Sequence, residues 1–360
     1  DTTPAGKKVT PSLREQEQEL QVQICKGVYP TKVTVCELVE RYITTKTGVT
    51  HNTKTGYRTV QNILEKEPFG HKPIDKIKFS DAKIFLIGLQ DKGRSYSTVH
   101  SIRGVLRPAF QMAFEDNEIG YNPFNFELAK VLINDSVQRK ALSPQEQRLF
   151  MDFVKNDKHF SRYYDGISIL FKTGLRISEF CGLTVHDINF DDHTFSVNDQ
   201  LQRTREGEYI IVPTKTKAGK RVLPMTKEVE EHFRNIIEAR KNPRIEPMVD
   251  GKSGFLYLDK NGNPSLALHW AHYFKRICQK YNSIYRVQMP AVTPHVCRHT
   301  YCSNMARSGI SAKTLQYLMG HSDISVTLNV YTHLGLEDAQ HELKKLEKRT
   351  NSHNSKIVNF

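Results

Sequence analysis

The chain has 360 residues, with 52 lysines and arginines against 39 aspartates and glutamates, so its formal net charge is +13. A hydrophobic content of 38% supports packed cores, whereas a mean hydropathy of −0.53 without a long apolar run argues against a membrane span or a membrane partner. The positive charge favours an anionic polymer as partner, although many basic proteins bind no such polymer.

The length of the chain predicts two domains and an appendage. The cysteines form neither a CxxC pair nor a dense framework, which is typical of a reduced cytoplasmic protein. They are Cys25, Cys36, Cys181, Cys278, Cys297 and Cys302. The first residues, DTTPAGKK, contain neither an initiator methionine nor a signal-peptide pattern, so we expect a trimmed N-terminus rather than a secreted protein.

The N-terminal part of the chain is predicted to be helical. Residues 11–27 form a predicted polar helix whose apolar stripe is too narrow for a domain of its own. A capping box of Thr34 with Glu37 begins the next helix, because each side chain can bond the backbone amide of the other residue. Further predicted helices cover residues 53–66, 80–92 and 97–115. Residues 31–126 are therefore expected to form a compact bundle of about four or five helices.

Some basic residues of this bundle remain for solvent or phosphate once the apolar positions are assigned to the core. They are Lys83, Arg94, Arg103 and Arg107. Contact with a nucleic-acid backbone is one interpretation of this basic surface, and a simply solvated face is about equally well supported by these residues alone.

A second domain is expected after a polar linker, residues 134–142. Ser143, Pro144 and Glu146 supply the N-cap, N1 and N3 residues of a new helix. Short alternating segments are then predicted to form one small antiparallel sheet, and they cover residues 193–197, 208–213 and 220–225. Helices resume at 227–240, near 267–281 and from Pro294 onward. The expected fold is thus mainly α with a small antiparallel β-sheet.

The helix that follows Thr293 contains a candidate anion site. Thr293 is a suitable N-cap and Pro294 a suitable N1 residue, which fixes the phase of the helix. His295 and Arg298 are three residues apart, so they share a face at the positive end of the helix, where unpaired backbone amides also favour an anion. A helix that merely begins with polar residues is the simpler alternative, because HxxR alone is a weak motif.

The same helix contains His299 and Cys302, a pair that raises the question of zinc. Their spacing with the neighbouring residues fits no usual closed zinc site. We therefore predict no metal site, and nothing in the sequence indicates another cofactor.

A histidine and a tyrosine follow at the end of this region. Gly320 permits a left-handed turn after a predicted helix, which would point His321 out of the core. Tyr331 comes ten residues later, at the end of the apolar stretch ISVTLNVY. Most of the fifteen tyrosines are expected to pack, Tyr301 and Tyr317 among them, and Tyr331 stands out only through its neighbours.

An arginine lies upstream in the segment TGLRISEF. Gly174 ends a predicted helix, and Arg176 lies at the joint to the next one, with Glu179 three positions on. The carboxylate can therefore hold the guanidinium in one orientation. A purely structural salt bridge is the alternative.

The hairpin TKTKAGKR carries Lys215, Lys217 and Lys220 between two predicted strands. A lysine on a flexible turn can give a proton to a leaving oxygen if nearby cations lower its pKa. The other lysines of the turn, Lys217 and Lys220, are expected to contact DNA if the partner is DNA. Charged hairpin tips are more often simply solvated, so the sequence alone leaves both interpretations open.

Taken in their order, TGLRISEFCGLT, TKTKAGKRVLP, TPHVCRHTYCSNM and LMGHSDISVTLNVYTHL resemble the tyrosine recombinase family of the phage integrase type. The resemblance covers nearly the whole chain. In the N-terminal half and around the HxxR helix, the chain is similar to integrases of conjugative transposons from Gram-positive bacteria. Each motif alone is weak, whereas the ordered set is specific.

The resemblance implies a site-specific DNA recombinase that excises and integrates a mobile element through a 3′-phosphotyrosine intermediate. It implies Tyr331 as the nucleophile and Glu179 as an accessory acidic residue. The residues that would activate the scissile phosphate are Arg176, Lys215, His295, Arg298 and His321. Lys215 matches the lysine of the family best, and Lys217 is the alternative because the length of the hairpin varies in the family.

The resemblance also implies the organisation of the chain as a C-shaped clamp on DNA. Its expected parts are a remnant of an arm-binding domain with a helix only (1–30), a helical core-binding domain (31–133), the linker (134–142) and a mixed α/β catalytic domain (143–335). Residues 336–360 would form a C-terminal helix and tail that docks on a neighbouring protomer. Packing of that helix on its own domain is the alternative.

The implied partners follow from the same resemblance. They are double-stranded DNA at attachment or crossover sites, further copies of the chain in dimers or tetramers on DNA, an excisionase and host DNA-bending proteins. The expected location is the bacterial cytoplasm, in association with the nucleoid.

Two other classes of function compete with this interpretation. A basic DNA-binding regulator would use the same charge without any catalysis. A metal-dependent nuclease would use the histidines, but the sequence lacks the clustered carboxylates that hold two metal ions. A covalent protein–DNA adduct that forms in EDTA would separate the recombinase from both.

Overall fold

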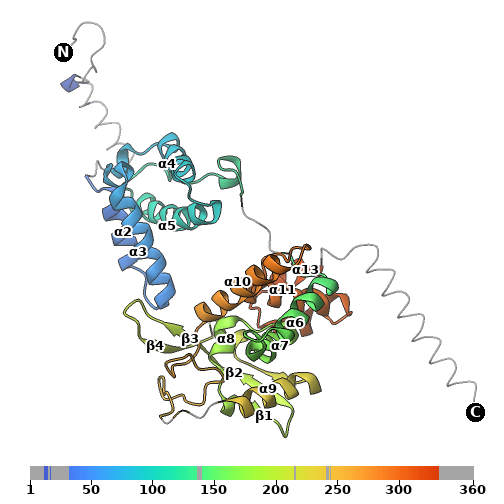
Figure 1. Ribbon diagram of the computed structural model, residues 1–360. Coiled ribbons are helices and arrows are strands. Elements are labelled where there is room, and N and C mark those ends of the chain that lie inside the picture. The colour runs from blue at the N-terminus through green and yellow to red at the C-terminus, as the bar shows by residue number, and fades with distance from the viewer. Residues whose placement is uncertain are drawn as a thin grey trace, which may run out of the picture. The chain divides into compact units, whose positions relative to one another are not determined.

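The structure of the chain is a computed structural model that describes residues 12–14, 17, 32–135, 140–214, 216–240, 243 and 245–331. The backbone divides into two compact units, Asp1–Gln138 and Arg139–Phe360, and the division falls within the predicted linker (Figure 1). Each unit folds around a core of its own. Most of the predicted helix 11–27 and all of the predicted tail 336–360 lie outside the described residues.

The first unit is a helical bundle. Its α-helices are α2 (Val35–Thr44), α3 (His51–Lys66), α4 (Phe79–Asp91) and α5 (Tyr96–Glu115). Helix α2 begins with the predicted capping box, in which Thr34 and Glu37 bond each other's backbone amides. The N-cap of α3 is Thr50, so this helix begins two residues before the predicted start at residue 53. Fully buried Leu38 and Phe110 are among the side chains that hold the bundle together.

The second unit contains the remaining α-helices of the described residues. They are α6 (Pro144–Asn156), α7 (Tyr164–Thr173), α8 (Ile177–Cys181), α9 (Lys227–Ala239), α10 (Ala267–Ile284), α11 (Pro294–Arg307), α12 (Ala312–Met319) and α13 (Ile324–Tyr331). The caps that the sequence predicted are present, because Ser143 accepts from Glu146 in a capping box and Thr293 accepts from the amide of Val296. These caps fix where α6 and α11 begin.

The strands of the second unit form two antiparallel sheets within the described residues, where the sequence predicted one. The first sheet has the order β1-β2-β5, with β1 (Ile188–Asn189), β2 (Thr194–Val197) and β5 (Arg221–Pro224), and the second pairs β3 (Asp199–Arg203) with β4 (Tyr209–Pro213). The difference arises because a tight turn, in which the Thr204 amide donates to the Glu208 carbonyl, folds β4 back on β3. β4 is therefore paired locally, and β5 pairs with β2 instead.

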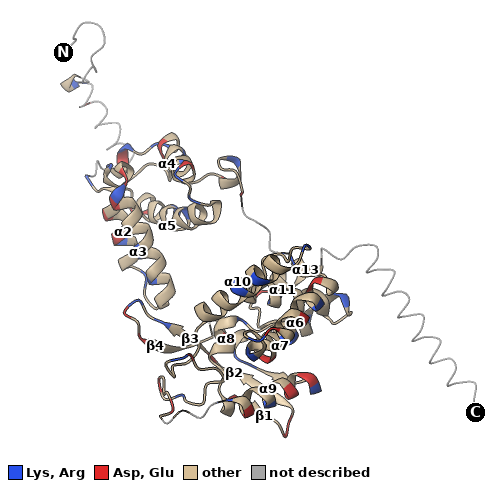
Figure 2. Cartoon of the chain, in the orientation of Figure 1, with Lys and Arg blue, Asp and Glu red and all other residues tan. Residues whose placement is uncertain are grey.

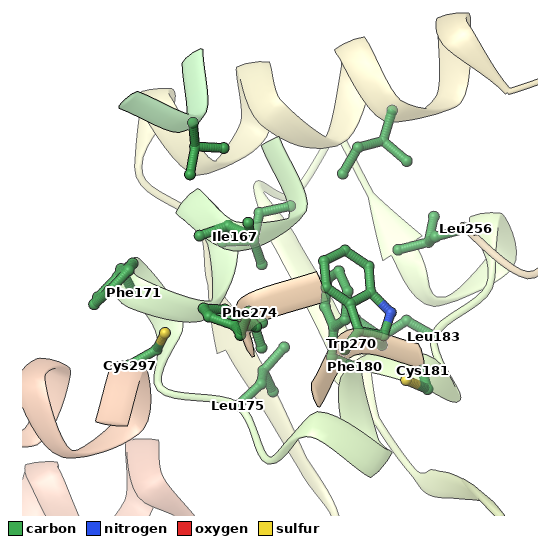
Figure 3. Close-up of a cluster of buried hydrophobic side chains, with 14 of the residues drawn as sticks. Ile167, Phe171, Leu175, Phe180, Cys181, Leu183, Leu256, Trp270, Phe274 and Cys297 are labelled. Carbon is green, nitrogen blue, oxygen red and sulfur yellow. The ribbon is translucent and has the colours of Figure 1, made fainter. Parts of the chain in front are cut away.

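The main core of the second unit lies between α7, α8, α10 and α11. Figure 3 shows Trp270 among Phe180, Leu183 and Leu256, with Ile167, Phe274 and Cys297 close by. Trp270 is fully buried and meets Phe180 edge to face, at a centroid distance of 5.1 Å. This packing holds in place the helices that carry the candidate site.

A smaller hydrophobic cluster joins α11 to α12 and α13. Its buried members are Tyr301, Cys302, Ala306, Leu315 and Met319. Half-buried Val330 and Tyr331 pack against this cluster. Tyr301 is therefore packed as predicted, whereas Tyr317 is 53% exposed, contrary to the prediction, because its hydroxyl reaches out to the backbone carbonyl of Val222.

Two kinds of feature are absent from the described part of the chain. No helix there is long and apolar enough to cross a membrane. In the same residues, no group of three or more histidine, cysteine, aspartate or glutamate side chains could hold a metal ion.

Candidate functional site

The turn between α7 and α8 positions Arg176. Gly174 ends α7 in the left-handed region, with φ of +63°, and buried Leu175 anchors the next residue. Arg176 is then the N-cap of α8, and Glu179 accepts from both its backbone amide (3.1 Å) and its Nη1 (2.6 Å). The guanidinium is thus held in one orientation, as the spacing in the sequence predicted.

Glu179 is completely buried and joins two arginines. Its Oε1 accepts from Arg176, and its Oε2 accepts from Nη2 of Arg221 at 3.1 Å. Burial alone would raise the pKa of the Glu179 carboxyl, but Arg221 and Arg176 together lower it below its ordinary value. The carboxylate is therefore charged at neutral pH and keeps both guanidiniums in place.

The C-terminal end of α12 is the place where three arginines meet. Arg221 donates from Nε to the carbonyl of Leu318 at 3.0 Å. Arg298 donates from Nη2 to Met319 at 2.6 Å, and Arg176 donates from Nη2 to Gly320 at 3.0 Å. The last carbonyls of a helix lack intrahelical partners and carry partial negative charge, so guanidiniums are suitable donors to them.

Arg298 is the most deeply buried of the cations that the sequence singled out. It is 8% exposed, and its Nη1 donates to the carbonyl of Gly174 at 2.6 Å. Burial, followed by repulsion from Arg176 and Arg221, lowers the pKa of Arg298 to about 9. The side chain is still charged at pH 7, and an anion beside it would relieve this repulsion.

The charges of this cluster do not cancel. Three guanidiniums, those of Arg176, Arg221 and Arg298, surround the single carboxylate of Glu179, which leaves two formal positive charges. In a partly buried place such an excess favours an anion strongly, because screening by water is weak there. We call these four residues the arginine cluster.

His321 comes directly after Gly320, whose carbonyl accepts from Arg176. Gly320 has a φ of +62°, and this left-handed turn leads the chain away from α12, as predicted. The ring nitrogen Nδ1 of His321 lies 2.9 Å from the hydroxyl of Thr327. Burial and the nearby arginines, Arg298 first among them, lower the pKa of His321 to about 4. The imidazole is therefore neutral at pH 7.

Tyr331 is bound to the loop before α12. Its hydroxyl donates to the backbone carbonyl of Ile310 at 2.6 Å, and its ring packs on the small cluster of α11 and α12. The sequence led us to expect the phenol among the arginines and histidines. In the structure its hydroxyl bonds the backbone of the loop before α12.

The remaining expected site residues have different surroundings. His295 is exposed on the first turn of α11, one turn before buried Arg298. Lys215 lies outside the described residues. Lys217 and Lys220 are exposed at and after the short 3-10 helix η6 (Lys217–Gly219). The structure therefore brings together Arg176, Glu179, Arg298 and His321 from the predicted set.

The pair that raised the question of zinc does not meet on one face. His299 is exposed, whereas Cys302 is 2% exposed in the small cluster. Burial raises the pKa of the Cys302 thiol to about 11, so it carries no thiolate at neutral pH. One side chain of the pair thus faces the surface, and the other packs in the small cluster.

The basic residues of the first unit divide into exposed and packed ones. Arg94 and Arg107 are exposed, and Arg107 donates to Asn125 Oδ1 at 3.0 Å. Arg103 is half-buried and donates to the backbone carbonyls of Phe124 and Phe126, while Lys83 lies over the ring of Phe126. Arg103 thus helps to hold the backbone at Phe124 and Phe126, a role that its position in the sequence did not indicate.

Sequence reasoning missed Arg221 and Thr327. Both are buried polar residues in segments whose neighbours are apolar, RVLP and ISVTLNVY. A charged or hydroxyl side chain at an inward position needs a partner, because its burial without one is costly. The sequence therefore indicated that Arg221 and Thr327 need buried partners, but it did not indicate which residues those partners are.

Comparison with known proteins identifies the family. The sequence model of the phage integrase family matches residues 140–337. Over 351 residues the chain is 40% identical to the transposase from transposon Tn916 of Enterococcus faecalis, which covers 97% of this chain and 86% of that protein. It is 25% identical over 288 residues to tyrosine recombinase XerC of Bacillus subtilis, which covers 77% of this chain and 85% of that protein.

Solved structures give the same answer. The Tn1549 transposon integrase in complex with circular intermediate DNA is 40% identical, with a TM-score of 0.81 over 87% of this chain and 100% of that chain. A lambda integrase dimer bound to a core site has 19% identity and a TM-score of 0.59 over 83% of this chain and 95% of that chain, which supports the fold alone. The chain therefore belongs to the phage integrase family of tyrosine recombinases.

Proposed function

We propose that this protein is the integrase of a conjugative transposon, which cuts and rejoins DNA strands when the element is excised and inserted. The observation that carries the proposal is the arginine cluster at the end of α12, which keeps two formal positive charges beside neutral His321. Relatives that are 40% identical are a transposon transposase and a transposon integrase whose structure is in complex with circular intermediate DNA.

In this proposal the arginine cluster binds the scissile phosphate. A phosphodiester carries one negative charge, and the pentavalent transition state carries more, so preformed cations stabilise the transition state preferentially. Arg176 and Arg298 donate to the non-bridging oxygens, and His321 adds a neutral donor. Each donor contributes on the order of a few kcal/mol. We propose no metal ion or other cofactor, since guanidiniums and lysine can supply the positive charge.

Tyr331 is the proposed nucleophile. Its phenol, with a reference pKa of about 10, loses its proton as the oxygen attacks phosphorus, and His295 is the proposed acceptor. The bond from phosphorus to the 5′ oxygen breaks, and Lys215, or Lys217 as the alternative, gives that oxygen a proton. The 3′-phosphotyrosine keeps the bond energy until another 5′ hydroxyl attacks, so no ATP is consumed. The phenol must first leave the carbonyl of Ile310.

We propose that both units bind the duplex, the first (31–133) as the core-binding domain and the second (143–335) as the catalytic domain. Exposed Arg94 and Arg107 are suitable for phosphate contacts in the first unit, with Lys83 and Arg103 beside them. In the second unit, α10 carries basic Lys275, Arg276 and Lys280, whereas acidic residues gather on α9 (Figure 2). This asymmetry favours the α10 side, together with Lys217 and Lys220, for DNA.

Self-association on DNA through the tail 336–360 is a further part of the proposal. Helix α13 exposes apolar side chains and buries a polar one, the reverse of what a helix facing water shows. Ile324, Val326 and Leu328 are 38%, 50% and 44% exposed, while Thr327 is buried. The chain continues for 29 residues after Tyr331 (360 minus 331), and those of a second copy could cover this apolar face. An excisionase, host DNA-bending proteins and a place at the bacterial nucleoid remain predictions.

The test is a covalent adduct in the absence of metal. The protein would be incubated in EDTA with nicked duplexes taken from the ends of the element that carries its gene, and adducts would be separated in denaturing gels. We expect an adduct for the wild type and none for Tyr331→Phe. Tyr317→Phe is the matched control, because its hydroxyl also donates to a backbone carbonyl, that of Val222.

Three outcomes distinguish the candidate functions. An adduct whose peptide mass maps to Tyr331, with Tyr317→Phe fully active, supports the recombinase. DNA that is bound but never joined to the protein would point to a regulator. Cleavage that disappears in EDTA would point to a metal-dependent nuclease.

A further inference from the structure

One buried arginine, Arg221 on β5, connects the segments that carry the proposed catalytic groups. We propose that Arg221 is a positioning residue, which holds the lysine-bearing turn before β5 in register with the phosphate site. The inference depends on the proposed function, because it concerns the step in which a lysine of that turn protonates the leaving oxygen.

The contacts of Arg221 reach three separate parts of the chain. Its Nη1 donates to the carbonyl of Gly219 at 2.7 Å, within the turn. Its Nε donates to Leu318 at the end of α12 (3.0 Å), and its Nη2 donates to Glu179 Oε2 (3.1 Å). The side chain is 0% exposed, so every one of these bonds is sheltered from water.

The inward position of Arg221 in β5 argues against a purely structural role for its charge. Residues of β5 alternate between buried and exposed, and Arg221 occupies an inward position like Leu223 two residues later. Replacing all members of a buried ionic network by apolar side chains is often neutral or stabilising, because burying charges has a large desolvation cost. A buried guanidinium here is therefore better explained by what it positions.

The residues of the turn are hydrogen-bonded to one another, so a bond that fixes one of its carbonyls restrains the whole turn. The amide of Gly219 donates to Thr216 at 2.9 Å, and the amide of Lys220 donates to Lys217 at 3.2 Å. The hydroxyl of Thr214 also donates to the carbonyl of Thr216, at 3.1 Å. A bond from Arg221 to Gly219 therefore fixes the short segment that carries Lys217 and follows Lys215.

Gly320 gives independent support for this contact. A Cβ built on Gly320 would lie 2.8 Å from Nη1 of Arg221 and 3.1 Å from the carbonyl of Ala218. The residue just before His321 thus packs directly on Arg221 and on the turn. Through Glu179 the same guanidinium is also linked to Arg176. Loss of Arg221 would therefore release the turn from the groups that bind the phosphate.

The experiment compares two DNA substrates that differ in the leaving atom. In ordinary DNA the 5′ oxygen needs a proton as it leaves. In DNA with a 5′ sulfur at the scissile bond, the bond from phosphorus to sulfur breaks and a thiolate leaves without a proton. We expect Arg221→Met to slow single-turnover adduct formation on ordinary DNA by about 100-fold or more, and to slow it by a clearly smaller factor on the sulfur substrate, where only the charge lost from the arginine cluster counts.

Two controls separate positioning from general damage. Arg240 is nearly buried in the same unit, with 9% of its side chain exposed, and donates to Phe255 and Glu246, so Arg240→Met removes a comparable guanidinium elsewhere. It should slow both substrates by the same small factor. Arg176→Ala should slow both substrates strongly, because phosphate binding is needed whichever atom leaves.

Several results would overturn the inference. If Arg221→Met slows the reaction of both substrates equally, or behaves like Arg240→Met, then Arg221 has no role in positioning the proton donor. If Arg221→Met does not fold, Arg221→Lys takes its place. Lysine keeps the positive charge beside Glu179 but cannot bond all three partners of the guanidinium. The same change in the ratio of the two rates is then expected. A wild-type protein that forms no adduct on either substrate would instead contradict the proposed function.

Discussion

The imidazole of His321 and the hydroxyl of Thr327 lie 2.9 Å apart, from Nδ1 to Oγ1. Thr327 is completely buried on α13, so its hydroxyl has a fixed direction. His321 is neutral at pH 7, because burial and nearby arginines lower its pKa to about 4. With Nδ1 facing Thr327, the opposite nitrogen Nε2 points to the other side of the ring. Helix α13 thus carries the proposed nucleophile and also orients a proposed phosphate ligand.

Replacing Thr327 with valine should slow adduct formation while leaving the fold intact. Valine has nearly the same shape but no hydroxyl, so His321 would lose the partner that fixes its ring. We expect a loss of about 10-fold in the single-turnover rate, as is common for partners that orient an active-site histidine. Thr327→Ser, which keeps the hydroxyl, should retain most of the rate. Equal rates for the valine and serine variants would contradict this role.

His321 should also make the stability of the protein depend on pH. Its pKa is about 4 in the folded chain against an ordinary value of 6.5, so between these values the unfolded chain binds a proton that the folded chain does not. The free energy of unfolding therefore falls as the pH falls from 6.5 towards 4. His321→Asn cannot titrate, so its urea midpoint should fall less between pH 7 and pH 5. Parallel profiles for the two proteins would rule this out.

The local elements of the site could be predicted from the sequence because their signals are local. Gly174 and Gly320 adopt the left-handed conformation that their places after a helix indicated, and the N-cap at Thr293 fixed the start of α11. Arg176 and Glu179 lie three residues apart, so their ion pair was also foreseeable.

The connections between these elements were not predictable in the same way. Arg176 meets Gly320 across 144 residues, and Arg221 meets Leu318 across 97, so no spacing rule relates them. Strand β3, DQLQR, lacks the apolar alternation that marks a strand, and it was missed for that reason. The bond from Tyr331 to Ile310 likewise depends on how α13 packs on α11 and α12.

Replacing Gly174 with alanine should damage both stability and cleavage. Its φ of +63° disfavours a side chain, and an added Cβ would lie 2.4 Å from Cδ1 of Tyr301. We expect a loss of about 2 to 4 kcal/mol in urea unfolding, from strain and overpacking together. Gly251→Ala is the matched control, since its φ is +80° but nothing lies within 4 Å of an added Cβ. Equal losses for the two variants would contradict the contact with Tyr301.

Ser168, His232 and Asp165 form a chain of hydrogen bonds that has the order of a hydrolase triad. The hydroxyl of Ser168 lies 2.7 Å from Nε2 of His232, whose Nδ1 lies 2.7 Å from Oδ1 of Asp165. Ser168 is 2% exposed between α7 and α9, so substrate cannot reach it. We infer a structural role for this network.

Ser168→Ala tests that role. It should lower the free energy of unfolding by about 1 to 3 kcal/mol, because His232 loses a buried partner. The rate of adduct formation at saturating DNA should stay at the wild-type value. Exposed Ser308, whose hydroxyl donates to the carbonyl of Met305, is a control that should cost less when changed to alanine. A loss of cleavage without a loss of stability in Ser168→Ala would refute the structural role.

The exposed apolar face of α13 predicts how assembly on DNA can be blocked. Val326 is 50% exposed, so Val326→Asp should unfold at the wild-type urea concentration in the free protein. If the tail of a second copy covers this face, an aspartate there would be buried without a partner, which costs several kcal/mol and prevents docking. Met248→Asp introduces the same charge at a residue that is 69% exposed outside α13. Light scattering of the DNA complexes should then show single protomers for Val326→Asp and multimers for Met248→Asp, whereas identical assemblies would show that this face is not a docking surface.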